Sequence, residues 1–148
     1  MPVGSTHYVA DGFPDRIVAT PAQDAATGFA VAWRTDASVN QPRLELVVAG
    51  NSPGVGTPRR IRASTATLAS ENGSSHHHRA DVDGLHPDTL YAYRLPLTAY
   101  RVQGQGQGQG TWGAWNHFCT AATASTPLTL LYFGDTQNKN LSLVPRVI

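Results

Sequence analysis

Hydrophobic and polar side chains alternate in short segments along most of the chain. Phe29, Val31 and Trp33 are separated by alanines, and residues 44–48 repeat the alternation as Leu, Glu, Leu, Val and Val. Successive side chains of a strand point to opposite faces, so a period of two predicts strands with one buried face. Turn-forming residues, such as those at 50–54, separate the segments.

Further segments of the same kind extend the pattern. Ile61 lies among three arginines, which is typical of an edge strand because charge discourages pairing with another chain. Residues 80–85, 90–94 and 116–120 supply three more short strands, and no helical periodicity interrupts them. Many short strands joined by regular turns predict an all-β antiparallel sandwich, which we assign to residues 14–121.

The pattern changes after residues 122–127, whose Ala, Thr, Ser and Pro composition is typical of a linker. Residues 128–133 form an almost continuous apolar run, as in a parallel strand that is covered on both faces. Apolar residues between 143 and 148 then follow the spacing of a starting helix. We therefore expect residues 128–148 to be the first strand and helix start of an incomplete α/β domain, unable to reach native packing without parallel neighbours.

Composition excludes several functions. Only 14% of residues are charged and the formal net charge is +1, so no basic face for nucleic acid is expected. No apolar run approaches the ~20 residues of a membrane span, and residues 1–7 do not resemble a signal peptide. Cys119 is the only cysteine, which excludes an internal disulfide, and its place in a strand favours a small buried side chain. The compartment stays open.

Two stretches resemble known families. Residues 85–93 resemble the tyrosine corner of fibronectin-III-like and immunoglobulin-like sandwiches, in which Tyr91 would bury its ring and return its hydroxyl to the backbone. The succession of strands, with Trp33 in a structural position, resembles the N-terminal domain of purple acid phosphatases. Residues 131–138, Leu-Tyr-Phe-Gly-Asp-Thr-Gln-Asn, resemble the junction where that family begins its calcineurin-like metallophosphoesterase domain.

A carboxylate at the C-terminal end of a parallel strand points into the crevice where α/β folds place their sites, and its oxygens suit hard metals. The resemblance implies an acid phosphatase that hydrolyses phosphate esters at a binuclear centre of iron with zinc, manganese or a second iron. Asp135 would be its first metal ligand, and Gly134 would let the backbone turn closely beside it. Gln137 stands where many metallophosphoesterases have histidine. Its side chain would either contact the substrate or orient a metal ligand.

The remaining ligands of such a site are missing from this sequence. We therefore expect the chain by itself to be an inactive accessory domain that binds no metal tightly and packs on its own catalytic domain. The alternative is a freestanding module that binds protein or carbohydrate through Trp112 and Trp115, although packing at a strand end is the favoured role of these side chains.

Two local features belong to neither interpretation. His76, His77 and His78 follow a polar stretch and are expected on the surface, where only the first and third could converge. Residues 98–101 echo residues 91–94, and the alternating Gln-Gly run that follows predicts a flexible connection. We expect the first copy, with its two tyrosines, to occupy the strand.

Overall fold

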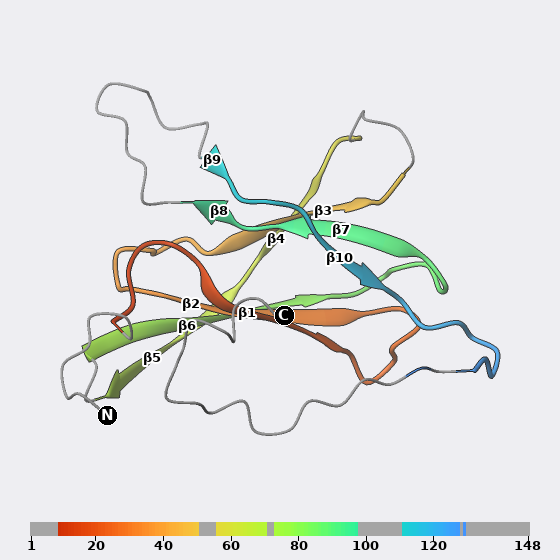
Figure 1. Cartoon of the computed structure of the whole chain (residues 1–148), viewed down its shortest axis with the longest axis horizontal. Helices are drawn as coiled ribbons and strands as arrows, with labels where there is room; N and C mark the ends of the chain where they lie inside the picture. The colour runs from red at the N-terminus through yellow and green to blue at the C-terminus, as the bar shows by residue number, and fades with distance from the viewer. Residues whose placement is uncertain (1–8, 51–55, 71–72, 98–110, 128, 130–148) are drawn as a thin grey trace.

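The chain is described here from a computed structural model, which defines residues 9–50, 56–70, 73–97, 111–127 and 129 (Figure 1). Within these ranges the backbone forms ten β-strands and no helix. No described segment therefore provides a helix with the length and hydropathy needed to span a membrane. The predicted incomplete α/β unit, residues 128–148, lies outside the described residues except for residue 129.

The first sheet has the strand order β1-β2-β6-β5 and is antiparallel throughout. Its strands are β1 (Asp15–Pro21), β2 (Phe29–Thr35), β6 (Gly73–Val82) and β5 (Ser64–Ser70). Six of the seven residues of β2 are buried, as expected of an interior strand, whereas every residue of the edge strand β5 is exposed.

The second sheet has the order β10-β7-β3-β4 and is also antiparallel. Its strands are β10 (Asn116–Cys119), β7 (Leu90–Arg94), β3 (Arg43–Val48) and β4 (Arg59–Arg62). The arginine-rich β4 lies at the sheet edge, which confirms the edge strand predicted around Ile61.

The two sheets form the layers of a sandwich, one above the other in Figure 1. A separate two-stranded ribbon, β8 (Pro96–Leu97) and β9 (Thr111–Trp112), flanks the second sheet. The all-β antiparallel sandwich predicted from the alternating pattern is confirmed.

The core lies between the sheets and is built from the inward-facing positions of both. Phe29 of β2 stacks on Phe118 of β10, with ring centroids 4.3 Å apart, and lies 5.9 Å from the ring of Tyr93 on β7. Each fully buried large side chain contributes roughly 1.5–3 kcal/mol. The other buried core residues are Val31, Trp33, Leu44, Leu46, Ala80, Val82, Leu85, Tyr91 and Leu95.

Tyr91 closes the turn that leads into β7. Its ring is buried, and its hydroxyl accepts a hydrogen bond of 2.9 Å from the backbone N–H of His86. The turn needs left-handed backbone at Gly84 and Asp88, with φ of 65° and 47°. The hydroxyl therefore satisfies a backbone donor that the turn leaves without a strand partner, as the tyrosine-corner resemblance implies.

The register of β7 settles which tyrosine-rich copy occupies the sheet. Tyr91 pairs with Val48, and Tyr93 pairs with Leu46. Both tyrosines are buried, which confirms the predicted assignment. The second copy, residues 98–101, lies outside the described residues.

Cys119 was predicted to be buried, and that prediction is wrong, because the side chain is exposed. It lies at the end of β10, an edge strand of the second sheet. Phe118 takes the inward position beside Phe29. Neighbouring side chains of a strand face opposite ways, so Cys119 must face outward.

Replacing Tyr91 with Phe should lower the free energy of unfolding in urea by about 1–3 kcal/mol, because the N–H of His86 would be left without its acceptor. Tyr93→Phe is the matched control, since the Tyr93 hydroxyl makes no hydrogen bond within the described residues. The control should stay within about 0.5 kcal/mol of the wild type. Equal stabilities of the two variants would contradict this role for the Tyr91 hydroxyl.

Candidate functional site

Charged side chains cluster around Glu45 on the outer face of the second sheet. Cross-strand register places Glu45 of β3 between Arg60 of β4 and Arg94 of β7. Arg60 donates to one carboxylate oxygen of Glu45 at 3.0 Å through Nε, and Arg94 donates to the other at 3.0 and 2.7 Å through Nε and Nη2. Only 3% of the Glu45 side chain is exposed, and both of its carboxylate oxygens are engaged in ion pairs.

Trp112 and Trp115 cover the other side of Arg94. Its guanidinium carbon lies 5.1 Å from the ring centroid of Trp112 and 4.4 Å from that of Trp115, which is cation–π geometry. Both tryptophans are half-buried. This packing on Arg94 favours the strand-end role of the two rings over an open platform for a ligand.

A second polar cluster surrounds His78, and here the sequence-based expectation of a surface side chain is wrong. The histidine triplet lies in β6, an interior strand, and only 1% of His78 is exposed. His76 and His78 do converge, with ring centroids 5.9 Å apart. The ring of Trp33 lies 5.4 Å from that of His78, so the imidazole belongs to the core.

Both ring nitrogens of His78 are occupied. Nε2 lies 2.8 Å from the hydroxyl of Thr35, and Nδ1 lies 2.9 Å from the hydroxyl of Thr65. Thr35 donates its hydroxyl proton to the carbonyl of Asp36, so it must accept from an Nε2–H. Nδ1 then accepts from Thr65, and the neutral imidazole has no lone pair left for a metal.

Burial, together with smaller contributions from the neighbouring His76 and His77, lowers the pKa of His78 from 6.5 to about 4. The buried ring is therefore neutral at pH 7. Protonation would place a second proton at Nδ1, where the ring accepts from Thr65.

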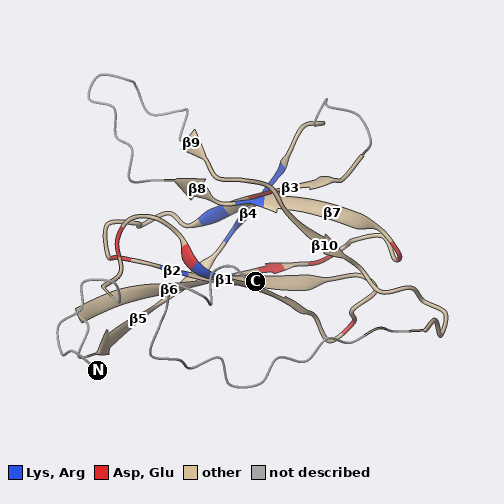
Figure 2. Cartoon of the chain, viewed as in Figure 1, with Lys and Arg blue, Asp and Glu red and all other residues tan. Residues whose placement is uncertain are grey.

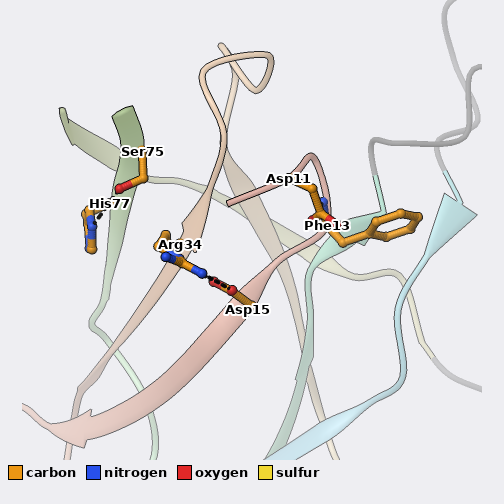
Figure 3. A network of polar contacts seen from close by, with 6 residues as sticks. All are labelled: Asp11, Phe13, Asp15, Arg34, Ser75 and His77. Atoms are coloured by element: carbon orange, nitrogen blue, oxygen red, sulfur yellow. Dashed lines mark hydrogen bonds and ion pairs between the residues drawn. The ribbon is translucent and has the colours of Figure 1, made fainter. Parts of the chain in front are cut away.

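A third polar contact ties β1 to β2. The Nε of the buried Arg34 donates to Oδ1 of Asp15 at 2.9 Å (Figure 3). This hydrogen bond, with the carboxylate charge, raises the pKa of Arg34 above its usual value. Figure 3 also shows the side chain of Ser75 beside the ring of His77, at 3.2 Å from its Nε2. The Arg34–Asp15 contact links two strands, whereas Ser75 and His77 lie on the same strand, β6.

The predicted metal ligand is not among the described residues. Asp135, Gly134 and Gln137 all lie outside them, while the predicted structural residues Trp33 and Tyr91 lie in the core. Across the described ranges no three His, Cys, Asp or Glu side chains come together in a way that could hold a metal ion. The described part therefore lacks the donor set that a binuclear centre requires.

The burial of His78 makes stability depend on pH. In the unfolded chain His78 has a pKa near 6.5 and is protonated below that pH. In the folded chain the same imidazole is protonated only near pH 4. The free energy of unfolding is therefore unaffected by His78 above about pH 6.5. It falls by about 3 kcal/mol in total as the pH is lowered from 6.5 to 4. Unfolding free energies from urea titrations between pH 7 and 4 measure it.

His78→Gln should flatten this part of the pH profile. His117→Gln is the matched control, because His117 is exposed on β10, and it should keep the wild-type slope. A slope that persists in His78→Gln would assign the pH dependence to other groups.

Comparison with known proteins agrees with the architecture just described. No curated protein matches the chain. The family described as Purple acid Phosphatase, N-terminal domain, matches residues 14–120. This match runs from just before β1 to the residue after β10 and so takes in both sheets of the sandwich. The chain belongs to the purple acid phosphatase N-terminal domain family.

Proposed function

We propose that the sandwich is the non-catalytic accessory domain of a metal-dependent phosphatase that hydrolyses phosphate esters. The family match over residues 14–120 is the observation that carries the proposal. The chemistry of the described residues supports it. Glu45 and His78, which are buried and titratable, are both committed to neighbours inside the domain.

The catalytic domain is proposed to follow the sandwich, with residues 122–127 as the linker and 128–148 as its first segment. The exit from β10 supports this division. Ala121 donates its N–H to the carbonyl of Ala25 and accepts from the N–H of Asp88, so the chain is anchored there. Residues 123–127 are exposed and belong to no strand. This anchor supports residue 121 as the proposed end of the sandwich, with the proposed linker following it.

Asp135 is proposed as the first ligand of the binuclear metal centre, which would contain iron with zinc, manganese or a second iron. When bound, such a centre activates water and neutralises the phosphoryl oxygens. The carboxylate oxygens of Asp135 suit these metals, whereas the neutral amide of Gln137 is a weaker donor suited to contacting substrate. The sandwich would pack against this catalytic domain.

Asp135→Asn tests the proposal in the polypeptide that carries this domain together with its catalytic domain. Loss of a ligand should lower phosphatase activity towards p-nitrophenyl phosphate by more than about 100-fold, the upper range for losing a residue that only supports a ligand. Metal content, measured by mass spectrometry of the purified protein, should fall in parallel.

Asp83→Asn is the matched control, since Asp83 is an exposed carboxylate that pairs with Arg59 at the surface of the sandwich. It should keep wild-type activity and metal content. Full metal content and activity in Asp135→Asn would refute the ligand assignment.

A further inference from the structure

Two arginines face each other at the edge of the second sheet. Arg43 of β3 and Arg62 of β4 are direct cross-strand partners. Like charges in this position destabilise a sheet, because the side chains stand side by side on one face. Both arginines line a hollow of about 280 Å³ together with Asn40, Gln41, Pro42 and Ala63.

No carboxylate of the described residues neutralises this pair. Glu45, the acidic residue nearest in the register, is held by Arg60 and Arg94. The Nε of Arg43 is buried and has no hydrogen-bond acceptor among the residues that the structure describes. Figure 2 shows basic residues concentrated where β3 and β4 pair. Leaving a buried donor unsatisfied is unfavourable, so this corner is short of negative charge and of hydrogen-bond acceptors.

The hollow is held in shape by its surroundings. The N–H of Ala63 donates to the carbonyl of Pro42 at 3.0 Å, which ties the two sides together. The guanidinium carbon of Arg43 lies 6.0 Å from the ring centroid of Trp112. Asn40 and Gln41 are exposed at the rim, and their amides are further hydrogen-bond donors. Donors and positive charge therefore meet at one preformed place.

We propose that the hollow binds a phosphate-type oxyanion between Arg43 and Arg62. The planar guanidinium group offers parallel N–H donors that match two oxygens of such an anion. Pockets for drug-sized ligands begin at about 300 Å³, so this hollow suits a single phosphate group. The proposal rests only on described residues of the sandwich and does not depend on the assignment of Asp135.

The test uses the full 148-residue chain with a chelator present, so that metal-bound phosphate plays no part. Inorganic phosphate should raise the melting temperature saturably above that in sodium chloride of equal ionic strength. Backbone amide shifts in NMR spectra should change at residues 40, 41, 43, 62 and 63. Arg62→Gln and Arg43→Gln should each raise the apparent Kd for inorganic phosphate by about tenfold or more, as expected for the loss of charge-assisted hydrogen bonds.

Arg79→Gln is the matched control, because it removes the same charge from an exposed pair with Asp81 on the first sheet. It should bind phosphate as the wild type does. Without phosphate, Arg62→Gln should be at least as stable as the wild type, because the facing charge is removed. Phenyl phosphate tests whether the phosphate group of an ester is accepted as well as the free ion.

Two results would overturn the proposal. One is a phosphate effect that does not saturate, as expected of an excluded salt that acts on the whole surface. The other is equal phosphate binding in Arg62→Gln, Arg43→Gln and Arg79→Gln. Either result would leave the accessory-domain proposal untouched, because that proposal rests on the family match and on Asp135.

Discussion

The packing of the two sheets depends on Phe29, whose ring is stacked on Phe118 and lies close to Tyr93. Phe29 begins β2, an interior strand of the first sheet, and Tyr93 lies in β7, an interior strand of the second. The contact between Phe29 and Tyr93 therefore joins an interior strand of one layer to an interior strand of the other. β3 and β6 are neighbours of these strands in their sheets. Because side chains alternate between the two faces of a strand, β3 and β6 direct their aliphatic side chains into the same interior.

Polar side chains that the sheets bury serve this architecture. Glu45 connects three neighbouring strands through Arg60 and Arg94, and His78 connects β2, β5 and β6 through two threonine hydroxyls. Such groups are costly to bury unless every donor and acceptor is paired, and here the pairing is supplied from within the sandwich. An accessory role agrees with this use of polar groups, since none of these side chains is left over for acid–base work.

The sequence predicted what depends on periodicity and turn chemistry. Alternation located the strands, the arginines around Ile61 marked an edge, and Tyr91 marked the corner, because each of these signals is local. His78 was misjudged because its burial depends on β5, an edge strand that covers it from a distance in sequence. Cys119 was misjudged because which face of a strand points inward depends on the partner sheet.

The candidate site was predictable only in part. Glu45 was read as one polar position of an alternating strand, whereas its burial follows from arginines that only the folded register brings beside it. The facing pair of Arg43 and Arg62 depends on the same register. Arginines on two other strands were the available signal for a buried acid, but their alignment is a tertiary property. The assignment of Asp135 as a metal ligand rests on a family resemblance, which gives no distances or angles.

The proposed accessory role means that the polar groups of the sandwich do not themselves perform phosphatase chemistry. The most direct test is to purify the 148-residue chain, verify its β-sheet content by circular dichroism, and measure metal content and p-nitrophenyl phosphate hydrolysis with iron, zinc or manganese supplied. We expect a folded protein with substoichiometric metal and no hydrolysis above the metal-only background. Two bound metals per chain together with metal-dependent turnover would contradict it.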